Sequence, residues 1–321
     1  MTALESPSPA TGGEPAHRTG AVLLAIETSG LNGSVALCRD GQCLEQSQLE
    51  LGKQHGQVLI PEIHALLKRH GLTARQCTHL AVSVGPGSFT GLRVGIVCAK
   101  TFAYATGCRL LAVGTLPAVA AGVADFYRMT TGLHEDIDAL VVVSDAQRGD
   151  LFVQKFVPSM GVENESRSWQ ADGPIMIQSA ELLKSKLSPR TLVAGPGLVQ
   201  HSASLQSVAP LADETTWHPL ARSVAHLATL AANRSERGTP TADEEGGSSH
   251  PSAPGVPERA MLTSERGTPT ADGESGSSHP SAPGDSPGAG LASYLADPWK
   301  LEPLYLRRSS AEDKWDALGR K

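Results

Sequence analysis

The sequence predicts an α/β protein of two lobes with a disordered insertion near the C-terminus. From residue 21 onward, the hydrophobic pattern switches in an orderly way between strand and helix periods. The second half of the chain echoes the element order of the first, as in a fold built from two related lobes. In addition, 40% of the 321 residues are apolar, which is enough for two cores.

In the first half, apolar segments joined by glycine turns predict an antiparallel meander, followed by a helix and further strands. The helix carries Leu59, Ile63 and Leu67 at helical spacing, and we expect Pro61 to kink it or to mark its first turn. The order βββαβαβ places strands at 21–29, 33–40, 41–50, 79–84 and 109–116 and the first helix at 56–70.

The second half opens with a strand, a turn at Arg148 and Gly149, and a returning strand over residues 138–158. A helix at 179–187, a strand at 191–197 and an amphipathic helix at 219–234 follow. The expected organisation is a disordered tail at 1–20, an N-terminal lobe at 21–118, a C-terminal lobe at 119–234, a disordered linker at 235–290, and a segment at 291–321 that completes the second lobe.

The linker contains an internal repeat. SERGTPTADEEGGSSHPSAPG at 235–255 returns at 264–284 with two differences in 21 positions. The unit has almost no large apolar residue, so it has no face to bury against a neighbouring repeat. A duplicated disordered linker is therefore expected, with a phosphorylation or docking tract as the alternative.

The charge distribution shows no excess of basic residues of the kind that a protein binding nucleic acid unaided usually has. Nine of the 33 acidic and three of the 27 basic residues lie at 235–290, which leaves 24 of each sign elsewhere. A nucleic-acid-binding face is usually a clustered basic one. We therefore expect any RNA partner to be shared with another protein.

The cysteines and the N-terminus favour a cytoplasmic protein. The five cysteines form no CxxC pair, and three lie in apolar runs, so reduced core thiols are expected. The first twenty residues are polar and contain no apolar segment that a secretory signal would need. No run approaches the roughly 18 apolar residues of a membrane span.

The glycine-rich stretch SVGPGSFTGLRVG at 83–95 matches none of the common phosphate or nucleophile motifs. It lacks the Lys of a Walker loop, the GxGxxG spacing and the GxSxG elbow. Small residues instead recur every four positions at Gly91, Gly95, Ala99 and Ala103, on one helix face. This face predicts close packing, either on the protein's own sheet or on another molecule. Ser88 or Thr90 is expected to cap the helix.

The same stretch resembles a known family. LAIETSGLNGSVAL at 24–37, GPGSFTGLR at 85–93, DAQRGDLF at 145–152 and PLYLR at 303–307 are similar to motifs of the bacterial tRNA threonylcarbamoyladenosine biosynthesis family TsaB. This YeaZ-like family was formerly grouped with the glycoprotease-like M22 proteins. The GPGSFTGLR core is specific, and the other motifs follow in the family's order.

The resemblance implies an actin and Hsp70-like (ASKHA) fold, with βββαβα repeated in each lobe. It also implies a partner subunit that dimerises with the catalytic TsaD through the helices matching 56–70 and 88–105, with the ATPase TsaE joining and tRNA reached indirectly. A homodimer in isolation stays open. The matching interface residues are His55, Leu59, Ile63, Ser88, Phe89, Thr90, Gly91, Leu92, Gly95 and Ala99. Under this docking hypothesis, a bulky residue at Gly95 is expected to abolish binding to TsaD and leave the fold intact.

The resemblance also bears on catalysis, because TsaD-like catalysts hold a metal with an HxxxH pair on one helix face. Here the helix carries His55 and His64, which nine residues place on opposite faces. We therefore expect no catalytic residue, no metal and no cofactor of the chain's own, with ATP and a metal supplied through partner subunits. His64 and His70 are expected to be solvated. The candidate residues near a nucleotide are Glu27, Thr28, Asp145 and Arg148.

Three functions compete. The leading one is a non-catalytic subunit of the complex that transfers the threonylcarbamoyl group from its adenylate to the adenosine beside the anticodon of ANN-decoding tRNAs. The alternatives are an autonomous M22-type metalloprotease or carbamoyltransferase, and a relative of sugar or acetate kinases. A stoichiometric metal ion or turnover of ATP with a small acceptor would favour these alternatives.

Overall fold

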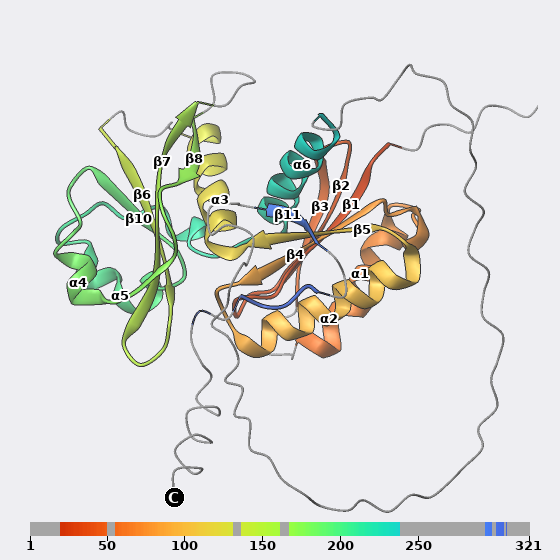
Figure 1. The fold of residues 1–321 in the computed structure, drawn as a ribbon, viewed down its shortest axis with the longest axis horizontal. Helices are drawn as coiled ribbons and strands as arrows, with labels where there is room; N and C mark the ends of the chain where they lie inside the picture. The colour runs from red at the N-terminus through yellow and green to blue at the C-terminus, as the bar shows by residue number, and fades with distance from the viewer. Residues whose placement is uncertain are drawn as a thin grey trace, which may run out of the picture.

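The computed structural model describes residues 20–49, 55–130, 136–160, 167–237, 293–296, 300–304 and 306. Two β-sheets lie side by side, each with its own helices, and helix α3 (Thr115–Met129) lies between them (Figure 1). This is the mixed α/β, two-lobed ASKHA-like fold that the sequence predicts. None of the helices in the described ranges is both long enough and apolar enough to cross a bilayer.

The first sheet has six strands in the order β11-β5-β4-β1-β2-β3. The meander is confirmed, because β1 pairs antiparallel with β2 and β2 with β3, whereas β4 and β5 run parallel to β1 and to each other. The bounds are β1 Val22–Glu27, β2 Ser34–Arg39, β3 Gln42–Gln48, β4 His79–Gly85, β5 Arg109–Gly114 and β11 Ser293–Ala296.

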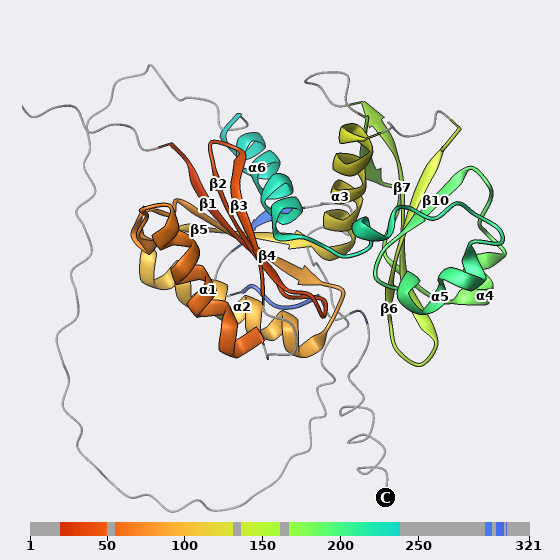
Figure 2. The same cartoon turned by 180° about the vertical axis from the view of Figure 1, so that it is seen from behind.

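Helices cover both faces of this sheet (Figure 2). Helices α1 (His55–Arg69) and α2 (Phe89–Thr106) lie on one face, and α6 (Ala221–Arg237) lies on the other. Alternate residues of β1 serve the two faces, since Leu24 packs with the α1 and α2 side chains and Leu23 with those of α6. Pro61 lies inside α1, well past its first turn.

The second sheet repeats the topology of the first. Strands β6, β7 and β8 form an antiparallel meander, and β10 runs parallel beside β6, giving the order β10-β6-β7-β8. This order corresponds to β4-β1-β2-β3 of the first sheet. The bounds are β6 Ala139–Asp145, β7 Asp150–Met160, β8 Arg167–Ala171, β9 Met176–Ser179, α4 Ala180–Lys184, β10 Thr191–Ala194 and α5 Leu198–Leu205.

The chain crosses between the lobes more often than the sequence predicts. Helix α3 continues through the expected boundary at 118/119 and packs on the second sheet. Helix α6, assigned to the C-terminal lobe, packs on the first sheet instead. The C-terminal segment was expected to complete the second lobe; β11 pairs with β5 of the first sheet and Leu301 is buried in the first core, whereas Leu306 packs against the second core. The placements of the 118/119 boundary, α6 and β11 differ from the expectation because elements were assigned to lobes by sequence order and not by the apolar face or strand edge that they join. The expected tail before residue 20 and the linker after residue 237 lie outside the described residues.

The small-residue face of α2 is packed against the end of β1 in the same lobe. A Cβ placed on Gly91 would lie 2.0 Å from the Thr28 carbonyl oxygen, and one on Gly95 would lie 2.2 Å from Thr28 Oγ1. Ser88 caps the helix as expected, since its hydroxyl accepts a hydrogen bond from the Gly91 amide at 3.2 Å. The stretch is therefore an intramolecular packing device.

The close approach makes Gly91 intolerant of even one methyl group. We expect Gly91→Ala to lower the free energy of unfolding by about 1–3 kcal/mol, because the clash is with backbone and cannot be relieved by a side-chain rotation. Urea denaturation of the purified chain measures this change.

Gly56 in the first turn of α1 is the matched control. Its nearest neighbour would be Val94 Cγ2 at 3.9 Å, an ordinary van der Waals contact, so Gly56→Ala adds a helix-favouring residue without a clash. We expect it to leave stability unchanged or raise it by up to about 1 kcal/mol. Equal effects of the two substitutions would contradict the packing account.

Candidate functional site

The outer face of α1 and α2 carries exposed apolar side chains. Ile60 is 64% exposed, Val97 62% and Tyr104 76%, and Phe89 is also exposed. On α2, positions 89, 93 and 97 are spaced four residues apart and therefore share a helix face. The guanidinium of Arg93 lies over the Phe89 ring, 4.1 Å from its centroid. We call this set (Ile60, Phe89, Val97 and Tyr104) the outer face.

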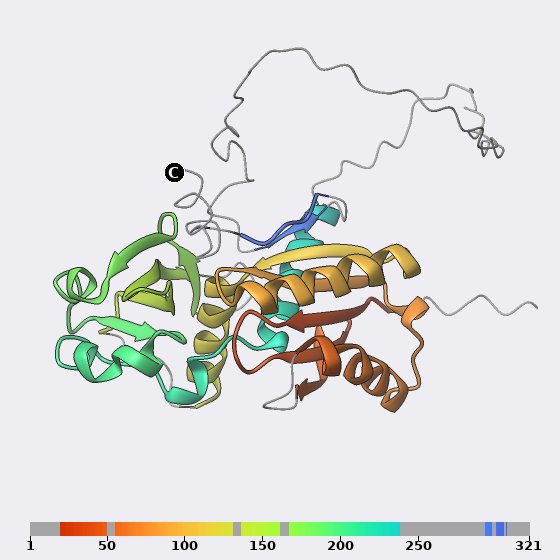
Figure 3. The same ribbon diagram turned by 90° about the horizontal axis from the view of Figure 1, so that it is seen from below.

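The two helices of the outer face lie next to each other along the first sheet (Figure 3). The Cβ position of Gly56 in α1 lies 3.9 Å from Val94 in α2, so the helices touch near the start of α1. Each helix buries one stripe on the sheet and leaves the opposite stripe exposed. The outer face thus places exposed large apolar side chains from two adjacent helices outside the core.

Most of the interface residues expected from the sequence do not belong to the outer face. Phe89 and Thr90 are exposed, and Ser88 is exposed but serves as the N-cap. His55 is the first residue of α1, and its side chain lies outside the described part. The remaining six are buried in the lobe's own interior and are unavailable to a partner: Leu59, Ile63, Gly91, Leu92, Gly95 and Ala99.

The expectation that a bulky residue at Gly95 spares the fold was therefore wrong. Of the two alternatives for the small-residue face, packing on the protein's own sheet is the one observed, because Thr28 lies against Gly91 and Gly95. The sequence does carry a signal for the exposed side of α2, which the interface prediction did not include. Val97 and Tyr104 are large apolar residues that lie out of phase with the buried stripe of this helix.

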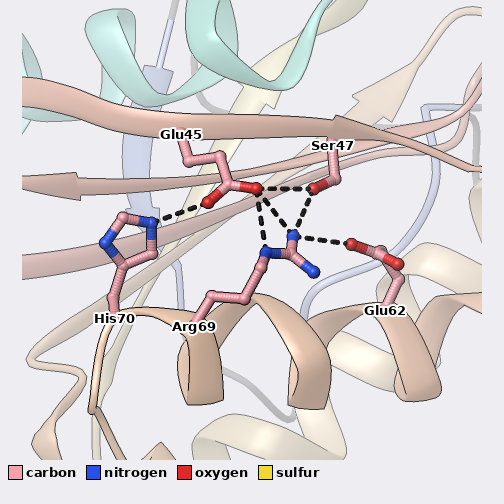
Figure 4. Close-up of polar contacts among 5 residues, drawn as sticks. All are labelled: Glu45, Ser47, Glu62, Arg69 and His70. Carbon is pink, nitrogen blue, oxygen red and sulfur yellow. Dashed lines mark hydrogen bonds and ion pairs between the residues drawn. The ribbon is translucent and has the colours of Figure 1, made fainter.

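A polar network fixes the end of α1 to strand β3 (Figure 4). Arg69 donates from Nε to Glu45 Oε1 at 3.0 Å and from Nη2 to Ser47 Oγ at 2.7 Å. It also reaches Glu62 Oε1 at 3.0 Å, and His70 Nε2 lies 2.8 Å from Glu45 Oε2. The hydrogen bond from Arg69, followed by that from His70, lowers the pKa of Glu45.

This network corrects the expectation for His70. Its ring is only partly exposed and is held by Glu45, whereas His64 is exposed as expected. Positions 55 and 64 lie on one continuous helix, half a turn apart around its axis. Within the described ranges, no three His, Cys, Asp or Glu side chains come together as metal ligands.

Glu27 lies at the end of β1 and is completely buried. Its Oε1 accepts hydrogen bonds from the Ser29 amide and the Ser29 hydroxyl, both at 2.5 Å. Its Oε2 has no hydrogen-bond partner among the described residues, and the same holds for the hydroxyls of Thr28 and Ser83. Ser83 follows β4 residue Val82, which pairs with Ile26, so it lies beside Glu27.

Burial raises the pKa of Glu27, and the Ser29 and Ser83 hydroxyls offset part of this effect. Ser83 acts here through proximity, since its oxygen lacks the geometry of a hydrogen bond. Burial therefore disfavours the charged form relative to an exposed glutamate. In its uncharged form the group can accept or donate a hydrogen bond but is a poor ligand for a cation.

The second lobe places its two candidates on the surface. The Asp145 carboxylate, exposed at the end of β6, accepts a hydrogen bond from the Gln147 amide at 2.7 Å and so stabilises the turn. Arg148 is exposed in that turn and has a left-handed backbone, with φ of 59°. These two residues stand in the β6–β7 turn, whereas Glu27 and Thr28 are interior to the first lobe.

Comparisons with known proteins agree on one group of relatives. The family described as TsaD, tRNA N6-adenosine threonylcarbamoyltransferase, matches residues 49–198. The tRNA threonylcarbamoyladenosine biosynthesis protein TsaB of Bacillus subtilis is 28% identical over 187 residues, which cover 58% of this chain and 76% of the relative. TsaB of Escherichia coli is 35% identical over 100 residues, 31% of this chain and less than half (43%) of the relative.

A solved structure extends the agreement to the fold. YeaZ from Pseudomonas aeruginosa superposes with a TM-score of 0.54 at 25% identity, over 67% of this chain and 94% of that one. The sequence relatives and the solved structure thus belong to one group, and the range 49–198 that the family model matches includes both helices of the outer face.

The buried carboxyl group of Glu27 gives a pH-dependent prediction. Its folded-state pKa lies above the ordinary value of 4.5, so between these two values the folded protein binds more protons than the unfolded chain. Stability from this group is complete below about pH 4.5 and is lost as pH rises through the folded-state pKa, at up to about 1.4 kcal/mol per pH unit. Glu27→Gln keeps the acceptor for Ser29 and does not titrate.

We therefore expect the free energy of unfolding of the wild type, relative to Glu27→Gln, to decline as pH rises. Urea denaturation of both proteins between about pH 5 and 8 measures this difference. Asp145→Asn, at an exposed carboxylate, serves as the control. A difference between wild type and Glu27→Gln that stays constant with pH would contradict a raised pKa.

Proposed function

Because the chain is a TsaB/YeaZ-like protein with a TsaD-like fold, we propose that it acts in the biosynthesis of threonylcarbamoyladenosine in tRNA. Its proposed role is that of a partner subunit, which binds and stabilises a TsaD-type catalytic subunit. That subunit would transfer the threonylcarbamoyl group from its adenylate to the adenosine beside the anticodon of ANN-decoding tRNAs.

The observation that carries this proposal is the outer face. Four large apolar side chains are exposed on two adjacent helices, although the lobe has a complete core beneath them. Aromatic and aliphatic anchors of this kind, with an Arg on an aromatic ring, are typical of the centre of a protein interface. A TsaD-type subunit shares the fold of this chain. Its docking on the outer face would remove these apolar side chains from water.

The proposal assigns no catalytic residue to this chain. Positions 55 and 64 point to opposite sides of α1, so a single helix face does not present two imidazoles to one metal ion. The carboxyl group of Glu27 is buried, and burial raises its pKa and so disfavours the charged form that a cation binds. Both observations support a role in which ATP and metal are used through partner subunits, including a TsaE-type ATPase.

Reconstitution tests this division of labour. The chain alone is expected to form no threonylcarbamoyladenosine on an ANN-decoding tRNA transcript supplied with threonylcarbamoyl-adenylate. Addition of a TsaD-type subunit and a TsaE-type ATPase with ATP is expected to restore the modification, read by mass spectrometry of the nucleosides. Modification by the chain alone would overturn the proposal in favour of an autonomous transferase.

The outer face yields a mutational prediction. We expect Val97→Glu to weaken binding to a TsaD-type subunit at least about tenfold, because it would bury an unpaired charge in an apolar contact. Val97 is 62% exposed, so the isolated protein should fold normally. Isothermal calorimetry measures the affinity, and circular dichroism verifies the fold.

Val199→Glu is the matched control, since Val199 is 63% exposed on α5 of the other lobe. It introduces the same charge at the same exposure, away from the outer face. We expect its affinity to equal that of the wild type. If Val97→Glu bound as tightly as Val199→Glu, the partner would have to dock elsewhere.

A further inference from the structure

Cys38 and Cys43 face each other across the hairpin that joins β2 to β3. The turn consists of Asp40 and Gly41, both with positive φ (51° and 81°), and this brings Cys38 and Cys43 into register as a directly opposed pair. Side chains of such a pair lie on the same side of the sheet, with Cβ atoms about 4.5–5.5 Å apart. A disulfide requires about 3.5–4.5 Å, so a small approach suffices to join them.

The hairpin has the freedom to make that approach. The register between β2 and β3 shifts directly beside the pair, between Leu37 and Cys38, where β3 carries one additional residue, Leu44. Strand β3 is also the edge strand of its sheet and is paired on one side only. Formation of a disulfide between Cys38 and Cys43 therefore disturbs a bulged sheet edge and not the sheet interior.

The two thiols differ in exposure and in acidity. Cys43 is exposed and Cys38 is buried against α6. The neighbouring Cys38 thiol, together with nearby Arg222 and the Glu45 amide, lowers the pKa of Cys43 to about 7 against the opposing effect of burial. The proximity of Cys43, together with burial, raises the pKa of Cys38. Cys43 is thus the exposed and more acidic thiol, and Cys38 lies directly opposite it as a second thiol.

The remaining cysteines of the chain provide an internal contrast. Cys77 and Cys108 are buried and close enough to interact, but burial raises the pKa of Cys77 to about 12 and also raises that of Cys108. Cys98 is half-buried, and burial raises its pKa to about 11. The expectation that all five are core thiols holds for Cys38, Cys77 and Cys108 and was wrong for Cys43.

We propose that Cys38 and Cys43 form a reversible peroxide-sensitive site, in which exposed Cys43 is oxidised first and Cys38 resolves it to a cross-strand disulfide. The Cys43 thiolate attacks one oxygen of a peroxide, forming an S–O bond and breaking the O–O bond. The released hydroxide or alkoxide takes a proton, which leaves Cys43 as the sulfenic acid.

Cys38 completes the cycle. Its sulfur attacks the Cys43 sulfur, the S–S bond forms and the S–O bond breaks, and the Cys38 proton leaves with the hydroxide as water. The two thiols lose two electrons together, and the peroxide is reduced to water, or to water and an alcohol. A small-molecule or protein dithiol restores both cysteines by exchange.

Mass spectrometry of the full chain tests this site directly. After hydrogen peroxide treatment near pH 7, trypsin cleaves at Arg39 between the two cysteines, so the disulfide appears as two joined peptides. We expect this bridge in the wild type and its loss after dithiothreitol. We also expect iodoacetamide to label Cys43 of the untreated protein more than tenfold faster than Cys98.

Single variants separate the two roles. Cys38→Ser is expected to leave Cys43 as a sulfenic acid that dimedone traps, and to slow Cys43 alkylation at pH 7 because the neighbouring thiol that lowers the pKa of Cys43 is removed. Cys43→Ser is expected to abolish both the bridge and the dimedone adduct, and Cys77→Ser to change neither. Circular dichroism verifies that each variant is folded. Absence of the bridge in the wild type, or alkylation of Cys43 no faster than Cys98, would overturn the proposal.

Discussion

The close approach of α2 to the end of β1 is the constraint on which the first lobe depends. Thr28 lies where side chains at Gly91 and Gly95 would otherwise project, so the helix must carry glycine at both positions. This contact sets the distance between helix and sheet, and with it the position of α1 beside α2. Because one stripe of α2 is committed to Thr28, the opposite stripe with Val97 and Tyr104 is left to solvent or to a partner.

The need to cover the apolar faces of both sheets also explains how the lobes are joined. The first sheet needs a cover on the side away from α1 and α2, and α6, which follows the second sheet in the chain, supplies it. Helix α3 leaves β5 of the first sheet and packs on the second. Each lobe is therefore completed by chain that lies beyond its own strands in sequence, which couples their folding.

Period and turn chemistry were sufficient to predict the meander, α1 and the repeated topology, because these depend on local signals. The strands expected at 33–40 and 41–50 meet at Asp40 and Gly41, and the structure places the hairpin turn at these two residues. The assignments of α6 and β11 failed because tertiary packing decides which sheet they join. The site residues failed for a related reason, since a stripe of small residues marks close packing whether the neighbour is another molecule or Thr28 of the same chain.

Glu27 shows what it costs a fold to keep a carboxyl group in its interior. A charged carboxylate at the end of a central strand needs several donors, whereas among the described residues Glu27 has only the donors of Ser29, both on one oxygen. Burial therefore works against the charged form and raises the pKa of this group, because the uncharged acid costs far less to bury. The carboxyl group lies between the ends of β1 and β4, where Ser83 stands beside it. A cation binds the charged form of a carboxyl group, so the same burial that raises the pKa also makes cation binding at this position less favourable than at an exposed carboxylate.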